Sequence, residues 1–324
     1  MNITRILVSV YLCVVLCCGP ALGQTNNLIR EDNIRAELGF LASDAMQGRG
    51  SGTNYERIAA EYIGSQFRQF GLEPAGDTDS AGNKSFVQRV PLESASSVTW
   101  NAVGVLKGSD PSTAAQVIML SAHLDHLGVS ETLSGDKIFN GADDDASGCV
   151  AVLELARVFG SGKRPKRTIY FVCFGSEERG GLGSQYFIAH PPVPLEQVVA
   201  DITFEMLGRP DAKVPAGTLW LTGFERSTLG PELAKQGASL VADPHPEQHF
   251  FQRSDNYPLA LRGVIAHTIS SFGLHTDYHR VSDEVGTIDF PFMTRSLNSL
   301  VKPIQWFANS DFRPTCLPGQ APTR

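Results

Sequence analysis

The loop from Asn140 to Gly148 constrains the fold of this chain more than any other segment. It reads Asn-Gly-Ala-Asp-Asp-Asp-Ala-Ser-Gly and runs directly into Cys149–Arg157, where apolar residues recur at helical spacing. Three adjacent carboxylates are costly to fold unless a positive group neutralises them. A bound cation can do this, and so can backbone N–H groups at the start of the following helix. Taken alone, the loop fits an acidic turn that caps a helix equally well.

Near-continuous apolar runs predict strands that are buried on both faces of a sheet. Helical patterns alternate with them, including Leu182–Ala189, and a long helix over Phe290–Asn309 closes the chain. This alternation indicates an α/β fold: a three-layer sandwich in which helices flank a mixed, mainly parallel sheet. The four predicted buried strands are Gln116–Ala122, Thr168–Phe174, Val198–Phe204 and Gly263–Ser270.

The amino-terminal part contains two amphipathic helical patterns, Asn26–Gly39 and Asn54–Phe70. We expect a glycine-rich loop over Asp44–Gly52 between them, which is no phosphate loop because no Lys-Ser/Thr pair follows it. The segments Phe86–Leu92 and Asn101–Leu106 alternate apolar and polar residues and predict strands toward one edge of the sheet.

The first 23 residues resemble an export signal. Arg5 precedes the apolar stretch Ile6–Cys18, and small residues before Gln24 suit a signal peptidase. We therefore expect a protein exported to the periplasm or the extracellular space, with residues 24–324 forming a single catalytic domain. A lipid anchor on Cys17 or Cys18 is disfavoured by the residues before them, and no later segment is apolar enough for a membrane helix.

Composition narrows the partners and the redox chemistry. The net charge of −7 and the lack of a long basic run argue against a nucleic-acid partner. Removal of the signal would leave Cys149, Cys173 and Cys316, an odd number. A disulfide between the first two cannot be deduced from the sequence.

Acidic and histidine residues gather where the predicted strands end. In open α/β sheets, ligands bind beyond the carboxyl ends of the strands, so we expect these residues to meet at one site. The candidates are His123, Asp125, His126, Glu177, Glu178, Glu205, His275 and His279.

These residue types suit metal-dependent hydrolysis. A carboxylate that accepts the second ring N–H of a histidine fixes a metal-binding tautomer, a role that Asp125 could serve for His123. Of the pair Glu177 and Glu178, one can bind metal while the other acts as a general base. An unpaired carboxylate on Glu205, at the end of an apolar strand, would be costly.

The chain resembles the M28 family of zinc aminopeptidases, and the matching pieces occur in the family's order. The matching pieces are Ala122–Gly128, Gly141–Gly148, Phe174–Glu178 with Gly181–Ser184, Phe204–Gly208, and Gly273–His279 with Asp283, together with Phe40–Arg49 and Gly71–Pro74 near the amino terminus. The resemblance implies the zinc-dependent exopeptidase fold, also called phosphorylase/hydrolase-like, and peptide substrates.

The resemblance further implies two zinc ions bridged by Asp144. One ion would take His123, Asp144 and Glu205, and the other Asp144, Glu178 and His279. Glu177 would be the general base and Asp125 would orient His123. From the residues alone, His126 could be a decoy or an outer group, and His275 is a rival of His279 in the same loop. Glu205 departs from the family, where Asp is more common, and its extra methylene changes the reach of the carboxylate. The segment Gln248–Asn256 resembles a family segment near the pocket wall.

Three functions remain open at this point. The first is removal of the amino-terminal residue from peptides. The second is a glutaminyl cyclase, which shares the fold and works with one zinc. The third is a non-catalytic binding protein on a peptidase fold, although such proteins typically lose ligands and this chain keeps a candidate at every position.

Overall fold

A computed structural model describes residues 28–92 and 98–322 of the chain. The predicted signal peptide therefore lies outside the described residues, and its cleavage remains a prediction. Among the helices in the described ranges, none is both long and apolar enough to span a membrane.

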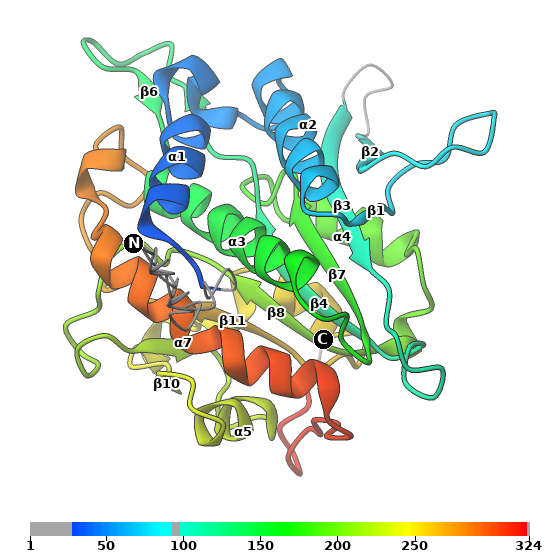
Figure 1. The fold of residues 1–324 in the computed structure, drawn as a ribbon. Helices are drawn as coiled ribbons and strands as arrows, with labels where there is room; N and C mark the ends of the chain where they lie inside the picture. The colour runs from blue at the N-terminus through cyan, green and yellow to red at the C-terminus, as the bar shows by residue number, and fades with distance from the viewer. Residues whose placement is uncertain (1–27, 93–97, 323–324) are drawn as a thin grey trace, which may run out of the picture.

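A nine-stranded sheet forms the centre of the molecule (Figure 1). Its strand order is β1-β3-β7-β4-β8-β11-β9-β10, with β2 also paired to β3. The four strands from β7 to β11 run parallel, while β3 and β9 pair antiparallel to them at either side. The strands are β1 (Glu73–Pro74), β2 (Val87–Pro91), β3 (Val98–Leu106), β4 (Val117–His123), β7 (Thr168–Phe174), β8 (Val198–Phe204), β9 (Leu219–Leu221), β10 (Leu240–Ala242) and β11 (Ala266–Ser270).

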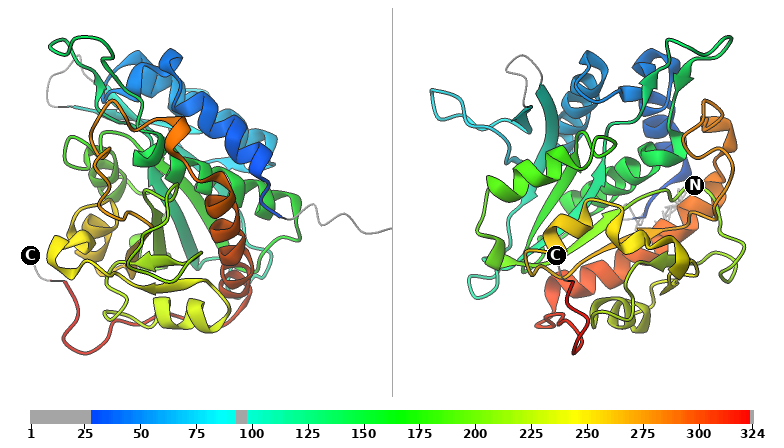
Figure 2. Two further views of the ribbon diagram at one scale, coloured as in Figure 1. Left: turned by 90° about the vertical axis from the view of Figure 1, so that its left-hand side faces the viewer. Right: turned by 180° about the vertical axis from the view of Figure 1, so that it is seen from behind.

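Helices cover both faces of this sheet, as Figures 1 and 2 show from opposite sides. On one face, α3 packs on β4, β7 and β8, while α1 packs against α3 and α7. On the other face, α4 packs on β3 and α6 packs on β8 and β11. The helices are α1 (Glu31–Leu41), α2 (Asn54–Gln69), α3 (Gly148–Ser161), α4 (Leu182–Ala189), α5 (Leu229–Lys235), α6 (Asn256–Ala260) and α7 (Phe290–Asn309).

The apolar runs of the central strands serve both cores. In β4, Ile118 and Leu120 belong to the core under α3, whereas Val117 and Met119 belong to the core on the opposite face. Alternate side chains of a strand point to opposite faces, so a strand between two helical layers is apolar at nearly every position. This confirms the predicted mainly parallel sandwich.

Predicted and observed elements agree closely where the hydrophobic pattern is strong. The strand Thr168–Phe174 and the helices Leu182–Ala189 and Phe290–Asn309 have the predicted bounds. The predicted loop over Asp44–Gly52 was wrong in part, because Asp44–Arg49 forms a short kinked helix, η1. The first helix begins at Glu31 and ends at Leu41, later than predicted, because the acidic residues Glu31 and Asp32 occupy its first turn.

Several short elements carried too little pattern to be predicted. They include β9, β10, α5 and α6, together with the hairpin of β5 (Gly128–Val129) and β6 (Ile138–Phe139). The acidic loop itself forms a distorted turn, η2 (Ala142–Ser147), that leads into α3. The peptide bond between Asp144 and Asp145 is cis.

Candidate active site

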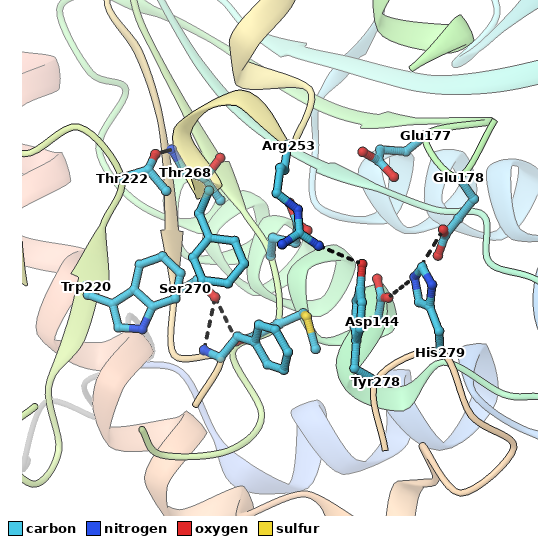
Figure 3. A pocket seen from close by; sticks show the side chains of 14 residues that line it. Asp144, Glu177, Glu178, Trp220, Thr222, Arg253, Thr268, Ser270, Tyr278 and His279 are labelled. Carbon is cyan, nitrogen blue, oxygen red and sulfur yellow. Dashed lines mark hydrogen bonds and ion pairs between the residues drawn. The ribbon is translucent and has the colours of Figure 1, made fainter. Parts of the chain in front are cut away.

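The parallel strands bring the predicted residues to one edge of the sheet. His123 is the last residue of β4, the pair Glu177 and Glu178 follows β7, and Glu205 follows β8. His279 comes from the loop between β11 and α7. Figure 3 shows the pocket that these loops enclose with the acidic turn η2. Five of the predicted residues line it, namely Asp144, Glu177, Glu178, Glu205 and His279.

Asp144 lies at the centre of this group. Its Oδ1 is 3.1 Å from His123 Nε2, and its Oδ2 is 3.1 Å from His279 Nε2. His279 Nε2 is also 3.2 Å from Glu178 Oε2. Zinc–ligand bonds of about 2.1 Å place tetrahedral ligands roughly 3.4 Å apart. The spacing of these atoms therefore fits ligands that share a cation.

The ionisation of these groups supports the same interpretation. Burial alone would raise the pKa of Asp144, but the neighbouring imidazoles of His123 and His279 hold it well below its usual value. Burial opposes the charged form of His279, yet its contacts with Asp144 and Glu178 raise its pKa to about 10. The carboxylates of Asp144 and Glu178 therefore stabilise positive charge at this position.

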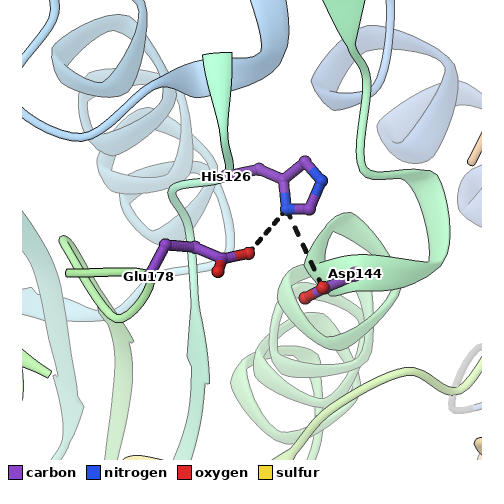
Figure 4. A group of neighbouring side chains, drawn as sticks. All are labelled: His126, Asp144 and Glu178. Carbon is purple, nitrogen blue, oxygen red and sulfur yellow. Dashed lines mark hydrogen bonds and ion pairs between the residues drawn. The ribbon is translucent and has the colours of Figure 1, made fainter. Parts of the chain in front are cut away.

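His126 is a second imidazole at the same carboxylates, as Figure 4 shows. Its Nδ1 is 2.8 Å from Glu178 Oε1 and 3.9 Å from Asp144 Oδ2. Ligand atoms of His126, Asp144 and Glu178 lie within 4.8 Å of one another, a spacing that could hold a metal ion. Glu178 thus presents Oε1 to His126 and Oε2 to His279, and the geometry offers two histidines where the sequence analysis favoured one.

The main-chain oxygen of Asp125 lies nearer to the His123 ring than its carboxylate does, whereas the sequence analysis expected the carboxylate to contact the ring. His123 Nδ1 lies 3.2 Å from the main-chain oxygen of Asp125 and 3.7 Å from its carboxylate Oδ1. The carboxylate instead accepts hydrogen bonds from Glu177 N at 2.9 Å and from Ser51 Oγ at 2.5 Å. Asp125 therefore fixes the start of the Glu177–Glu178 loop as well as the ring of His123.

Glu177 and Glu205 are half-buried residues whose carboxyls have raised pKa values. Burial is the largest cause for both, and it raises the pKa of Glu205 to about 7. Glu205 Oε2 is buried and has no hydrogen-bond partner among the described residues. An orphaned carboxylate oxygen inside a protein is costly, and a cation beside it would remove that cost. The donor set and this orphaned oxygen together fit zinc or a similar ion.

Flanking aspartates hold the loops without facing the pocket. Asp145 accepts hydrogen bonds from the main-chain N–H groups of His123, Gly148 and Met206 at 3.0–3.2 Å. Asp283 accepts from the N–H groups of Asp143 and Asp144. The family resemblance singled out Asp144 as the bridging ligand and included Asp283 among the matched residues, but it gave no role to Asp145 or Asp283.

Asp143 explains the position of the rival histidine. Its Oδ2 is 2.9 Å from His275 Nε2, and its Oδ1 accepts a hydrogen bond from Gly208 N at 2.7 Å. His275 thus contacts a structural aspartate, whereas His279 contacts Asp144 and Glu178.

Arg49 is a positive group under the acidic turn that the sequence analysis missed. Its buried guanidinium donates hydrogen bonds to the carbonyl oxygens of Leu41, Leu124, Asn140 and Gly141 at 2.6–2.9 Å. It therefore ties η1 to the end of β4 and to the start of η2. Gly141 has a positive φ of 58°, and a Cβ there would collide with the His126 ring and the Asp144 carbonyl.

Three non-glycine residues adopt left-handed backbone conformations at the site. They are Ser176 before Glu177, Met206 after Glu205, and His279 itself, with φ values between 53° and 57°. Such conformations cost of order 1 kcal/mol each and cluster at functional sites. Here each one lies at or beside a candidate ligand or base.

The segment Gln248–Asn256, predicted to lie near the pocket wall, does so. Phe250 and Arg253 line the pocket together with Trp220, Phe272 and Tyr278. The Tyr278 ring stacks on His279 with centroids 3.9 Å apart. Asp255 is buried in the same segment, and burial raises its pKa to about 7. No individual residue of this segment could be singled out from sequence, because none follows a strand end.

Comparison with known families matches residues 101–301 to the description "Peptidase family M28". The chain belongs to peptidase family M28. Among curated relatives, the leupeptin-inactivating enzyme 1 of Streptomyces exfoliatus is 27% identical over 184 residues, which cover 55% of this chain and 36% of the relative. A probable leucine aminopeptidase 2 of Aspergillus oryzae is 27% identical over 192 residues, which cover 57% of this chain and 36% of the relative. The M28 chain thus spans about a third of the length of these relatives.

Solved structures share the fold. A zinc aminopeptidase from Bacillus subtilis aligns with a TM-score of 0.66 at 16% identity, covering 87% of this chain and 96% of the other. A glutaminyl cyclase from Porphyromonas gingivalis aligns with a TM-score of 0.61 at 19% identity, covering 86% and 98%. At these identities the likeness establishes the M28-type fold and leaves the choice of reaction to the site.

Proposed function

We propose that this M28 chain is a zinc-dependent aminopeptidase that removes the amino-terminal residue of peptides. One observation carries the proposal: each oxygen of Asp144 faces a different histidine, with Glu177 in the same pocket. The name of the Aspergillus oryzae relative supports peptide substrates, and that of the Bacillus subtilis structure supports zinc. We also propose that residues 24–324 form one catalytic domain, exported by the segment 1–23 to the periplasm or beyond.

The residues fit two zinc ions that share Asp144. His123, Asp144 and Glu205 would hold one ion, and Asp144, Glu178 and His279 the other. His126 would then orient Glu178 through its 2.8 Å contact with Oε1, which leaves Oε2 for the metal. When bound, zinc supplies Lewis-acid chemistry that polarises a water and the scissile carbonyl.

Glu177 is the proposed general base. Burial raises its pKa above the usual range of a carboxyl, the direction in which enzymes tune a carboxylate that serves as a general base. It would take a proton from the attacking water and deliver it to the nitrogen of the departing peptide. The hydrogen bond from Glu177 N to Asp125 holds the main chain from which the carboxylate projects.

Glutaminyl cyclisation with a single zinc is the second candidate, because the structure of a cyclase aligns over most of this chain. Glu205 decides between the two candidates, since the longer side chain alters the first zinc position. The zinc content of mature protein purified without chelator is the test. About two ions per chain with hydrolysis of leucine amide supports the aminopeptidase. One ion with cyclisation of amino-terminal glutamine supports the cyclase, and no zinc after add-back refutes both.

The two histidines of the late loop provide a matched pair of variants. We expect His279→Ala to lose one zinc per chain, because its Nε2 contacts both Asp144 and Glu178. His275→Ala should keep the full zinc content, since His275 contacts Asp143 instead. Metal analysis of the two purified variants checks this. The opposite pattern would make His275 the ligand.

Glu177→Gln separates metal binding from turnover. We expect kcat for leucine amide to fall about 10³-fold, the usual contribution of a general base, while the zinc content stays at the wild-type value. Steady-state kinetics and metal analysis on the same preparation measure both. A variant that retains more than a tenth of the activity would exclude Glu177 as the base.

A further inference from the structure

Arg253 lies on the wall between two hollows of the M28 chain. It lines the pocket that holds Asp144 and Glu205, and it also lines a neighbouring hollow of about 530 Å³. Glu177 lines both hollows too. The second hollow therefore adjoins the proposed base, and its volume lies within the range of ordinary ligand sites.

The guanidinium of Arg253 has neutral partners only. Its Nη2 donates a 3.4 Å hydrogen bond to the Tyr278 hydroxyl, drawn in Figure 3, and its carbon lies 5.0 Å from the centre of the Phe250 ring. In the part of the chain that the structure describes, no carboxylate pairs with it. Arg253 is exposed, so its charge is available to a molecule that enters either hollow.

This placement contrasts with the rest of the pocket. The other charged residues that line the pocket are carboxylates and one histidine, a set suited to cations and to a substrate's amino group. A guanidinium presents a rigid fork of N–H donors that matches a carboxylate in a bidentate arrangement. A cationic group without an anionic partner at the edge of an acidic site indicates an anion on the substrate.

We propose that Arg253 binds a carboxylate of the substrate peptide. This inference rests on the proposed aminopeptidase function and names its substrate class: short peptides whose anionic group lies near the scissile bond. The free carboxyl end of a dipeptide or tripeptide is the source that the geometry favours. An extended residue spans about 3.5 Å, so such an end lies only one or two residue lengths from the bond that is cut.

The second hollow supports that source. Its lining combines apolar side chains, Ile188, Pro258 and Leu261, with a second arginine, Arg262, and with the carboxylates Glu177 and Asp255. The apolar residues suit the side chain of the residue that leaves, and the two arginines suit its terminal carboxylate. An acidic side chain on the first residue of the peptide could also present a carboxylate to Arg253, from the pocket that contains Asp144 and Glu205.

Binding measurements on zinc-loaded Glu177→Gln protein test the proposal without turnover. Calorimetry would give the affinities of Leu-Leu and Leu-Leu amide, which differ in the terminal carboxylate, and of Glu-Leu amide and Gln-Leu amide, which differ in the side-chain carboxylate. The same four peptides are then measured after adding Arg253→Gln, Arg253→Lys or, as a control, Arg295→Gln. Arg295 is an exposed arginine of α7.

We expect Leu-Leu to bind about tenfold tighter than its amide, as a charge-assisted hydrogen bond allows. Arg253→Gln should reduce this ratio to near one, Arg253→Lys should restore part of it, and Arg295→Gln should leave it unchanged. If Glu-Leu amide binds tighter than Gln-Leu amide and this preference depends on Arg253, the carboxylate that Arg253 binds belongs to the side chain of the first peptide residue instead. Ratios that are near one, or that survive Arg253→Gln, overturn the proposal, as does failure of all four peptides to bind.

The failure of this inference is distinct from the failure of the proposed function. Wild-type protein that cleaves leucine amide but shows no carboxylate preference would keep the aminopeptidase and refute the role of Arg253. Wild-type protein that binds Leu-Leu through Arg253 but hydrolyses neither Leu-Leu nor Leu-Leu amide would keep the carboxylate site and refute the aminopeptidase.

Discussion

Asp145, which is buried, and Glu205, which is half-buried, lie at the same edge of the sheet, but their oxygens are satisfied in opposite ways. Asp145 accepts three main-chain N–H hydrogen bonds, from His123, Gly148 and Met206. Glu205 keeps one buried oxygen without any partner among the described residues. The hydrogen bonds of the first carboxylate join the loops, whereas the second keeps an oxygen free for the metal that we propose. Burial alone therefore does not identify a functional carboxylate, and the count of its donors does.

Asp201 lies between these two cases. It sits inside β8, where its oxygens accept hydrogen bonds from the hydroxyls of Ser121 and Thr203 at 2.8 Å each. Burial nevertheless raises its pKa to about 7. Two hydroxyl donors thus stabilise the ionised form less than burial destabilises it. The three carboxylates form a series that stability measurements on zinc-free protein can test.

Asp145→Ala should have the largest effect. The change leaves three buried N–H groups without an acceptor, and we expect a loss of about 3 kcal/mol in the free energy of unfolding. Urea denaturation of the zinc-free protein measures it. Glu131→Ala, at an exposed position, serves as the control and should stay within about 0.5 kcal/mol of wild type. A loss below about 1 kcal/mol for Asp145→Ala would mean that these hydrogen bonds do not hold the site loops.

Asp201→Asn should change how stability depends on pH. The folded carboxyl has a raised pKa, so it keeps its proton between about pH 4 and pH 7 while the unfolded chain releases it. Stability of the wild type therefore falls as pH rises through this window, by about 2 kcal/mol from pH 5 to pH 7 through this group alone. The neutral amide of Asp201→Asn does not titrate, so the variant lacks this loss of stability between pH 5 and pH 7.

Urea denaturation at pH 5 and pH 7 compares the two zinc-free proteins. We expect the wild type to lose more stability than Asp201→Asn when the pH rises from 5 to 7. Asp32→Asn, an exposed aspartate of the first helical turn, is the matched control. A pH response identical in wild type and Asp201→Asn would show that Asp201 is ionised throughout this range.

Glu205→Gln should have the smallest effect on the free energy of unfolding. Unlike Asp145→Ala, it should raise the stability of the zinc-free protein. At pH 8 the folded carboxyl is ionised although burial raises its pKa to about 7, so its charge costs stability when no metal is present. We expect the zinc-free variant to be more stable than wild type by about 1 kcal/mol. Thermal unfolding with and without zinc should also show a smaller rise in Tm on zinc addition. A zinc-free variant less stable than wild type would place Glu205 among the structural carboxylates.

The sequence by itself determined the architecture of the sheet and the residue types of the site. Apolar runs such as Thr168–Phe174 predict strands buried on both faces, and a parallel sheet brings their carboxyl ends to one edge. For this reason Glu177, Glu178 and Glu205 could be expected to meet from local pattern alone. The family motifs added Asp144 and His279, which the structure places with them in one pocket.

Only the tertiary structure decided which polar groups support the site and which remain open. Asp143, Asp144 and Asp145 are chemically identical in the sequence, and their different roles follow from which N–H groups and rings surround each one. The same is true of Arg49, since three of its four carbonyl acceptors come from distant segments, and of Arg253, which follows no strand end. Hydrogen-bond partners that are remote in sequence leave no local pattern, because the fold alone brings them together.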